Sequence, residues 1–444
     1  MNKMLTNSKA AALGLQHVLA MYAGAILVPL LIGSAIGFNS EQMTYLVSID
    51  IFMCGVATVL QLVVNRYFGI GLPVVLGCAM QAVSPLILIG TTKSIGAMYG
   101  SIIASGIFII LIAGLFSKIK RFFPPVVTGT VITVIGLTLI PVGIEKMGGG
   151  MKSAADFGSG KYLFLAFLTV AIILGIQLFA KGFIHSLAII IGLIIGTIVG
   201  SFMGLVTLAP VAEATWFHFP QPFYFGAPIF EWSSILTMIL ISIVSMVEST
   251  GVYFALGEVT GQTIEEEHLK KGYRAEGLAI ILGGIFNTFP YTAFSQNVGL
   301  VQMSGIRTRK PIYFAAGFLM VLGLVPKIGA FATIIPEPVL GGAMMILFGM
   351  VATQGVKMLS QVDLNEDGNL MIVALSLGLG LGVTVVPELF ANLPAAVQTF
   401  TGNGIVMTSV TAITLNILSH HGRKKQAVEM VVEEGNLIDL PETV

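Results

Sequence analysis

Long apolar stretches dominate the chain, and short breaks rich in Gly, Pro and charged residues separate them. A helix that crosses a bilayer needs about 20 consecutive, mostly apolar residues. By that criterion the sequence predicts fourteen spans, with twelve as the alternative count. Pro73, Pro85 and Pro290 interrupt the regions 72–90 and 274–306, so broken helices are expected there. The expected span cores are 11–33, 43–64, 72–90, 95–116, 125–144, 161–179, 184–206, 233–256, 274–289, 296–306, 311–329, 338–356, 369–389 and 400–419.

Basic residues test this count, because short cytoplasmic loops hold most of the Lys and Arg of a membrane protein. With fourteen spans and both termini inside, 17 of the 22 Lys and Arg fall on the cytoplasmic side. Moving one span boundary in the middle of the chain would destroy this asymmetry. The basic residues expected outside are Lys93, Lys146, Lys152, Lys161 and Lys327.

One sequence pattern occurs twice. Lys-Ile, an aromatic residue and Pro-Val-x-x-Gly recur in the stretches that start at Lys118 and Lys327, so that Pro125 aligns with Pro338. Under the expected topology the two copies enter the membrane from opposite sides. The fold class predicted is therefore an all-α polytopic membrane protein built from two inverted repeats of seven spans, the usual plan of secondary transporters. A chance recurrence of short apolar words is the alternative.

Composition agrees with a membrane protein. Of the 444 residues, 55% are hydrophobic and 10% are charged, with a mean hydropathy of +0.94, which excludes ordinary soluble domains. Equal numbers of basic and acidic residues, 22 each, give no indication of a nucleic-acid partner. Cys54 and Cys78 lie in apolar stretches, so neither a disulfide framework nor a metal cluster is expected. The apolar stretch 10–36 is too long for a signal-peptide core and is expected to be a retained span.

Acidic side chains at bilayer depth are the first candidates for function, because each costs about 2.5–3.5 kcal/mol on insertion scales. Glu248 lies well inside the eighth expected span, among Ser and Thr residues. A structural pair with a neighbouring helix is its alternative role. Glu276 lies at the start of the ninth expected span, where an acid in a first helical turn also suits the helix dipole. Asp50 is expected near the outer end of the second span, as an interfacial group.

The second candidate region is TFPYTAFSQNVG, which starts at Thr288. The run after Pro290 favours a short extended segment that leads into a half-helix. Free N–H groups at such a helix start, with the amides of Gln296 and Asn297, suit a polar planar ligand. The stretch GLPVVLGCAMQAVSPL, from Gly71, has the same plan. The two extended segments are therefore expected to face each other and form one site. Ala79 and Met80 are candidates for further contacts, with packing as their alternative role.

Gln16 and His17 are polar residues within the first expected span. A hydrogen-bonded strut is the first expectation for this histidine, with a ligand contact as the alternative. The other histidines show no metal-ligand spacing, and no HExxH, GxSxG or P-loop pattern occurs in the sequence. A membrane enzyme would need such a set, and a passive channel would not need an acid beside a broken helix. A transporter is the preferred class.

These residues together resemble the nucleobase-ascorbate transporter family, also called nucleobase:cation symporter-2. The run Gln296-Asn297-Val298-Gly299, followed after four residues by Ser304, is similar to the family signature, which usually has Thr at this last position. Gln16-His17 resembles the first-span motif, and Glu248 stands where the eighth-span acid is expected. Gln at position 296 looks like the branch of bacterial xanthine and uric acid permeases, whereas uracil permeases tend to carry Glu.

The resemblance implies a homodimer in the bacterial cell membrane, with both termini cytoplasmic. It also implies a core domain of residues 1–120 and 211–332, a gate domain of 121–210 and 333–420, and a cytoplasmic tail, 421–444. The expected function is proton-coupled import of a purine, xanthine first, by an elevator-type movement; uric acid and uracil are the alternative substrates. No cofactor or metal is expected beyond the coupling proton. The residues expected to bind substrate are Glu248, Gln296, Ala79, Met80, Phe294 and Ser295, and those expected for proton coupling or site architecture are Glu248, Glu276, His17, Gln16, Asn297 and Gly299.

Overall fold

The computed structural model describes residues 6–119, 124–366, 368–394, 398 and 401–419. The predicted cytoplasmic tail 421–444 lies outside the described residues. So do six of the basic residues assigned to the cytoplasmic side, namely Lys3, Lys120, Arg121, Arg423, Lys424 and Lys425.

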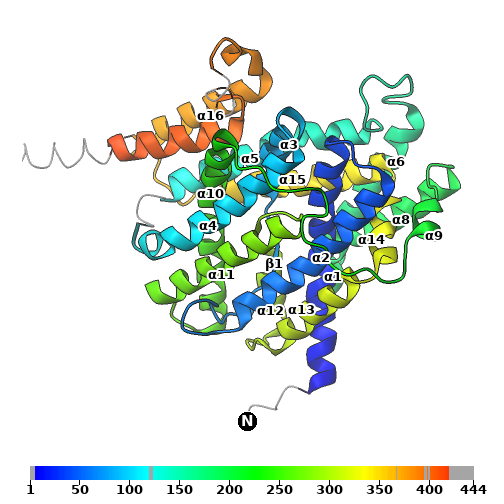
Figure 1. Cartoon of the computed structure of the whole chain (residues 1–444), viewed down its shortest axis with the longest axis horizontal. Coiled ribbons are helices and arrows are strands. Elements are labelled where there is room, and N and C mark those ends of the chain that lie inside the picture. The colour runs from blue at the N-terminus through cyan, green and yellow to red at the C-terminus, as the bar shows by residue number, and fades with distance from the viewer. Residues whose placement is uncertain (1–5, 120–123, 367, 395–397, 399–400, 420–444) are drawn as a thin grey trace, which may run out of the picture.

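Helices make up most of the described chain, and two three-residue strands lie near the middle of the molecule (Figure 1). The first half contains α1 (Asn7–Ala35), α2 (Ser40–Leu62), β1 (Leu76–Cys78), η1 (Met80–Ala82), α3 (Val83–Thr92), α4 (Ile95–Ile119), α5 (Pro125–Met147), α6 (Gly160–Phe179), α7 (Phe183–Ser186), α8 (Ala188–Phe202) and α9 (Ala209–Glu213). The second half contains α10 (Trp232–Thr260), α11 (Glu266–Ile285), β2 (Tyr291–Ala293), α12 (Gln296–Ser304), α13 (Lys310–Gly323), α14 (Pro326–Thr333), α15 (Glu337–Leu359), α16 (Asn369–Val385), η3 (Pro387–Phe390) and the helix Gly404–Ser419.

The two halves repeat one order of elements. Each begins with a helix of 29 residues, α1 or α10, and continues with a second helix, a short strand and a short helix. The halves interlock, because α1 and α2 pack on α13 while α10 and α11 pack on α4. The strands β1 and β2 pair antiparallel, as two inverted copies require. The fold therefore confirms the expected all-α membrane architecture with extended segments in its broken spans.

The repeated sequence pattern marks the helices α5 and α15, which have 23 residues each and both begin with a proline at their first or second position. These helices pack closely and run antiparallel. A Cβ atom added at Gly129 would lie 3.0 Å from the Gly355 carbonyl oxygen, and one added at Gly136 would lie 2.3 Å from the Ala352 nitrogen. Small residues thus let the two backbones approach along most of their length.

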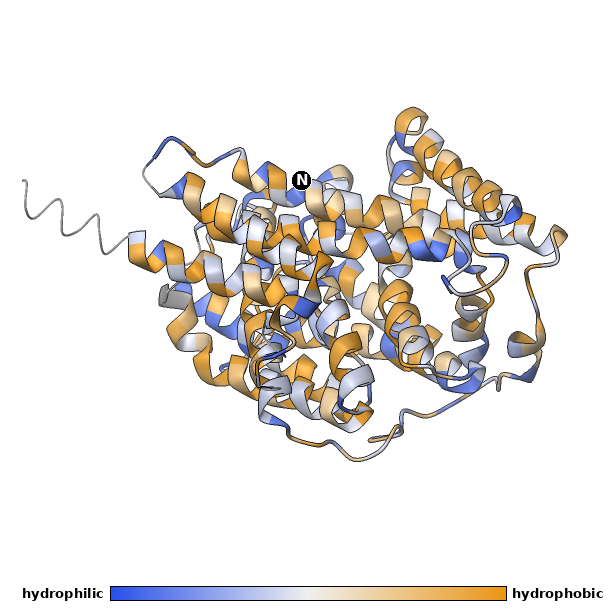
Figure 2. Ribbon diagram, turned by 90° about the horizontal axis from the view of Figure 1, so that it is seen from above, coloured by the Kyte–Doolittle hydropathy of each residue, from blue (hydrophilic) through white to orange (hydrophobic). Residues whose placement is uncertain are grey.

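Seven helices in the described chain are long and apolar enough to cross a membrane, or eight if α13 and α14, which are bent by 80°, form one span. The other predicted spans correspond to short or broken elements. Region 72–90 divides into β1, η1 and α3, and α12 has only nine residues. The count of fourteen therefore stays a prediction. Apolar residues cover the outer faces of the helices, whereas hydrophilic residues gather in the connections (Figure 2), as expected for a surface in contact with lipid.

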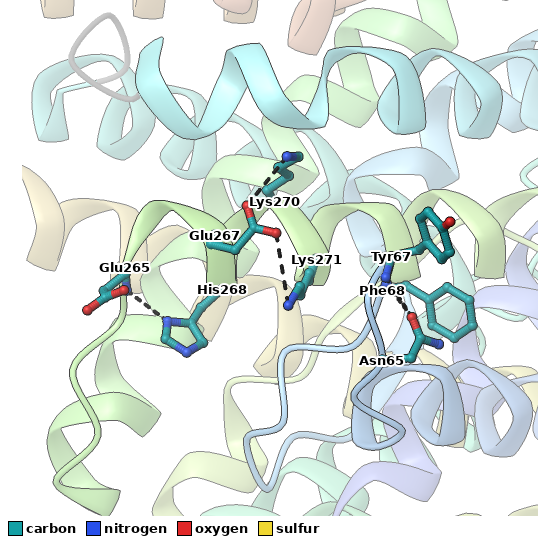
Figure 3. Close-up of polar contacts among 8 residues, drawn as sticks. All are labelled: Asn65, Tyr67, Phe68, Glu265, Glu267, His268, Lys270 and Lys271. Atoms are coloured by element: carbon teal, nitrogen blue, oxygen red, sulfur yellow. Dashed lines mark hydrogen bonds and ion pairs between the residues drawn. The ribbon is translucent and has the colours of Figure 1, made fainter.

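The helix α11 differs from the sequence prediction. A span core of 274–289 was expected, but one continuous helix runs from Glu266 to Ile285. Its charged first turns form ion pairs, since Glu267 lies 3.4 Å from the Lys270 ammonium and 3.9 Å from that of Lys271 (Figure 3). The loop 63–71 lies beside this end of the helix, and its Gly69 N–H donates to the Lys271 carbonyl oxygen at 3.2 Å.

Candidate functional site

The candidate site is built on the paired strands β1 and β2, of which β1 begins three residues after Pro73 and β2 directly after Pro290. In their register Leu76 faces Ala293, Gly77 faces Thr292 and Cys78 faces Tyr291. Two further backbone bonds extend the pairing, from Phe294 N–H to the Val75 oxygen at 3.0 Å and from Ala79 N–H to the Pro290 oxygen at 2.9 Å. The strands therefore satisfy their backbone groups inside the protein, which the bilayer interior requires of irregular segments.

A short helical segment continues from each strand. The 3₁₀ turn η1 and helix α3 follow β1, and α12 follows β2. Ser295 and Gln296, at the start of α12, are exposed, as is Gly299, whose absent Cβ would meet nothing within 4 Å. The amide of Gln296 is thus accessible, and first-turn N–H groups lie beside it.

Glu248 lies on the helix α10, which contacts both η1 and α12, and its side chain is partly exposed. Gln81 of η1 donates to the Ser245 hydroxyl at 2.6 Å and also hydrogen-bonds the Glu248 carboxylate. Gln81 was missed in the sequence analysis, although it stands one residue after Met80 in the same stretch. The residues next to Gln81 in the sequence do not indicate its role, because its hydrogen-bond partners belong to a helix more than 160 residues away in the chain.

Phe294, Ala79 and Met80 form the apolar part of this region. The Phe294 ring lies between two glycines, because a Cβ added at Gly77 would lie 2.2 Å from its Cε2 atom and one added at Gly24 would lie 2.9 Å from its Cε1 atom. Phe294 is 6% exposed and Ala79 is fully buried, whereas Met80 is partly exposed. Of these three candidates, Met80 is the most exposed.

His17 and Asn297 connect the helices α1 and α12. The Asn297 Nδ2 atom lies 3.0 Å from His17 Nδ1 and 3.4 Å from the His17 carbonyl oxygen, and both residues are buried. The histidine is therefore hydrogen-bonded across two helices, an arrangement compatible with the strut expected from the sequence, and its role in the site stays a prediction. The Oδ1 atom of Asn297 is buried and has no partner among the residues that the structure describes, so it can accept a hydrogen bond. Gln16, the neighbour of His17, is partly buried.

Glu276 lies in the middle of α11, a helix that packs against β2, rather than at a helix start. It is the eleventh residue of α11 and is 1% exposed, so the first-turn role is wrong. The Tyr253 hydroxyl donates to its carboxylate, and Gln61 Nε2 lies 2.8 Å from that hydroxyl and 2.9 Å from the Gly272 oxygen. The sequence analysis missed Gln61 and Tyr253, which long-range packing alone brings to Glu276.

A second set of hydroxyl contacts connects α10 to the strand β2. Ser249 shares a 2.9 Å hydrogen bond with Thr292 and accepts one from the Ala293 N–H at 3.2 Å. Because Ser249 follows Glu248 directly, these contacts fix the position of the Glu248 backbone against the strand pair.

Asp50 is not an interfacial group, as the sequence analysis expected. It lies in the middle of α2, is fully buried and accepts hydrogen bonds from Tyr291 at 3.0 Å and from the Cys78 thiol at 2.8 Å. The expectation failed because the span boundaries were placed from hydropathy, which does not show which helix face meets protein.

Comparison with known proteins gives consistent matches. The model of the permease family matches residues 8–389. A xanthine permease of Bacillus subtilis is 58% identical and covers 95% of this chain and 96% of its own length. The uric acid permease PucK of the same organism is 57% identical and covers 91% and 94%. The transmembrane domain of a cyanobacterial bicarbonate transporter, BicA, has a TM-score of 0.57 at 15% identity and covers 93% of this chain and 98% of that one, a likeness of fold alone.

The extent of these matches decides the class of the protein. They run through both halves of the fold and include the strands, Glu248 and the start of α12. The members of the matched family are permeases, and the apolar helices described above are those of a multi-pass plasma-membrane protein. The chain belongs to the nucleobase-ascorbate transporter family, and it is a membrane transporter rather than an enzyme.

Proposed function

We propose that this chain imports a purine nucleobase, with xanthine as the first candidate, together with a proton. The observation that carries the proposal is a convergence of elements: α10, which carries the partly exposed Glu248, contacts both η1, which carries its partner Gln81, and α12, which begins at the accessible Gln296. Relatives at 58% and 57% identity are a xanthine permease and a uric acid permease, so a purine dione is the substrate class that this convergence best fits.

Hydrogen-bond chemistry assigns the roles of these side chains. A carboxylate accepts from purine ring N–H groups, and the Gln296 amide can donate to a ring carbonyl while accepting from a neighbouring N–H. Met80 and Phe294 supply apolar surface beside the ring, and Ala79 and Ser295 flank it. Asn297, held by His17, fixes the start of α12 so that Gln296 keeps its orientation. Gln16 and Gly299 complete this support around the helix start.

Alternating access is proposed to follow an elevator-type movement between two groups of helices. The core domain, 1–120 and 211–332, would contain α1 to α4 and α10 to α14, and with them both strands. The gate domain, 121–210 and 333–420, would contain α5, α6, α8, α15 and α16. The close antiparallel packing of α5 on α15 supports a rigid gate, and the interlocked α1, α2, α4, α10, α11 and α13 support a rigid core. A homodimer formed through the gate would leave the core free to move.

Proton coupling is proposed to use Glu248, with Glu276 as the second acid of the pathway. No cofactor or metal takes part in this mechanism. The two acids belong to adjacent helices. Ser249, next to Glu248, bonds Thr292 of β2, and Tyr253 of the same helix donates to the Glu276 carboxylate. A change in one carboxyl can therefore alter the hydrogen bonds that hold the strand pair.

Uric acid is the second candidate substrate, since the relative that transports it is nearly as similar as the xanthine permease. Uracil remains the third. Uptake of labelled xanthine, uric acid and uracil should be compared in cells that lack their own nucleobase permeases, with and without a proton uncoupler. Saturable xanthine uptake that the uncoupler abolishes is the expected result. Uptake of uric acid alone would reassign the substrate, and equilibration without accumulation would show a passive channel.

A further inference from the structure

Two thiols and a carboxylate converge between the helix α2 and the strand β1. Asp50 and Cys54 stand one helical turn apart on α2, and Cys78 ends β1. One ligand atom of each lies within 4.8 Å of the others, with the Cys78 and Cys54 sulfurs 2.8 Å and 3.9 Å from the Oδ2 atom of Asp50. All three residues are fully buried. Cys78 comes from a different element than the other two residues, so the fold itself brings the three together.

The strand β2 orients the carboxylate toward the sulfurs. The Tyr291 hydroxyl lies 3.0 Å from the Oδ1 atom of Asp50 and 2.7 Å from the Thr288 hydroxyl. Oδ1 is therefore occupied by the tyrosine, and Oδ2 faces the two thiols. Among the described residues, Asp50 forms no ion pair with Lys, Arg or His within 4.0 Å. A buried carboxylate without a cation beside it provides a site of unbalanced negative charge when ionised.

We propose that Asp50, Cys54 and Cys78 form a binding site for a thiophilic divalent cation of the Zn²⁺ and Cd²⁺ class. Two thiolates and a carboxylate oxygen are ligands that such ions prefer over Mg²⁺ or Ca²⁺. At a Zn–S length of about 2.3 Å, tetrahedral ligation places two sulfurs about 3.8 Å apart, within the 4.8 Å limit of this cluster. Binding breaks both S–H bonds, and the two protons leave to solvent as the metal–sulfur bonds form.

A bound ion would join two separate elements of the fold. It would connect α2 to the last residue of β1, and Tyr291 would extend the connection to β2. Cys78 directly precedes Ala79, so the proposed metal site lies next to the candidate purine site but shares no side chain with it. Because all three ligands are buried, the ion enters only when the strand pair opens locally, and binding is expected to be slow.

Binding of Cd²⁺ to the purified full chain in detergent, under reducing conditions without a competing thiol, tests this site directly. The two cysteines of the cluster are the only ones in the sequence, so any ultraviolet thiolate-to-Cd²⁺ absorption band reports it. One Cd²⁺ per chain, with release of about two protons, is expected. Zn²⁺ should displace it, and millimolar Mg²⁺ should not. Cys54→Ala and Cys78→Ala should each weaken binding at least tenfold, whereas Glu276→Gln, a change of a buried acid elsewhere, should keep it.

Two results would overturn the site. The first is a wild-type protein that shows no absorption band and no bound Cd²⁺ after long incubation, which would leave Asp50 as a hydrogen-bonded strut. The second is a band and an affinity unchanged in both Cys→Ala variants. If either variant fails to fold, as size-exclusion chromatography would show, the stoichiometry, proton release and Zn²⁺ competition of the wild-type protein still decide the question. None of these readouts depends on which substrate the chain transports.

Discussion

At the residue scale, Glu248 is the side chain on which coupled transport should depend. It is partly exposed, and its partner Gln81 is itself fixed by Ser245. Glu248→Gln keeps the shape of the side chain but removes its ability to carry charge and exchange a proton. The variant should reach normal abundance yet lose purine accumulation by at least about tenfold, the cost expected when a charged hydrogen-bonding partner is lost. Uptake against a concentration gradient is the measurement.

Glu258→Gln is the matched control for this change, because Glu258 belongs to the same helix and is exposed. It should accumulate purine as the wild type does. If Glu248→Gln still drives uphill uptake, the coupling role passes to another acid, and Glu276 is the first to examine.

Gln296 should set selectivity among purines. A site with matched hydrogen bonds rejects a ligand that leaves a buried polar group unpaired, at about 1–3 kcal/mol for each such group. Gln296→Glu replaces a side chain that donates and accepts with one that only accepts when ionised. Competition of unlabelled xanthine against labelled xanthine should therefore show affinity at least about tenfold weaker, with unchanged abundance. Gln302→Glu, an exposed position on the same short helix, should leave the affinity as it is. An unchanged ranking of xanthine, uric acid and uracil in the Gln296 variant would contradict this role.

Residue identity was easier to predict than residue environment. Glu248 and Gln296 stood out in the sequence because polar groups are rare in apolar spans. Gln61, Gln81 and Tyr253 did not, because their roles come from contacts between helices far apart in sequence. Asp50 was misplaced for the same reason, since its depth depends on the strands that pack against α2.

At the scale of elements, the strand pair requires small residues around the Phe294 ring. A Cβ at position 77 would lie 2.2 Å from that ring, so Gly77→Ala forces the ring or the strand to shift. Overpacking of this kind costs about 1–3 kcal/mol. The variant should unfold at a lower temperature in detergent, and Gly77→Ala with Phe294→Leu should recover part of the loss. Gly317→Ala is the control, because a Cβ there would meet nothing within 4 Å. A Gly77 variant as stable as the control would show that the ring moves freely.

The start of α10 offers a prediction about pH. Glu231 caps this helix, and it accepts from the Ser234 N–H at 2.8 Å and the Ser233 hydroxyl at 2.6 Å. Partial desolvation raises the pKa of the Glu231 carboxyl, but the hydrogen bonds from Ser233 and Ser234 outweigh it and lower the pKa from 4.5 to about 2. Because the folded-state pKa is the lower one, this stabilisation is complete above pH 4.5 and is lost as the pH falls toward 2.

Glu231→Ala should therefore reduce the free energy of unfolding by about 1 kcal/mol at pH 7, as expected for a lost helix cap. The difference from wild type should shrink at pH 3.5. Thermal unfolding of both proteins at the two pH values measures it, with Glu213→Ala, an exposed acid of the preceding connection, as the control. A difference that stays constant between these pH values would mean that the charge of Glu231 contributes nothing.

At the scale of the whole molecule, the inverted architecture could be predicted from a short repeated pattern, and the way the halves interlock could not. Pro125 and Pro338 begin equivalent helices, which the pattern indicated. The packing of α1 on α13 and of α10 on α4 leaves no periodic signal in either partner, because each helix is apolar on most of its faces. Hydropathy also joined β1, η1 and α3 into one span, since it measures apolar content and not backbone form.

The arrangement of basic residues across the molecule gives the last prediction, the orientation in the membrane. Lys146, expected outside, binds Ser34 at 3.1 Å near the C-terminal end of α1, whereas Arg309, expected inside, binds the Leu62 oxygen at 2.8 Å at the far end of α2. The fold thus places these two residues at opposite ends, and the excess of Lys and Arg expected on the side of Arg309 points that end toward the cytoplasm. Cysteines introduced at the exposed positions Lys152 and Glu266 should react with an impermeant maleimide in intact cells only at Lys152, and at both after lysis. Cys54 and Cys78 are buried, so the wild-type chain is the background control. Labelling at Glu266 alone in intact cells would reverse the orientation and place both termini outside.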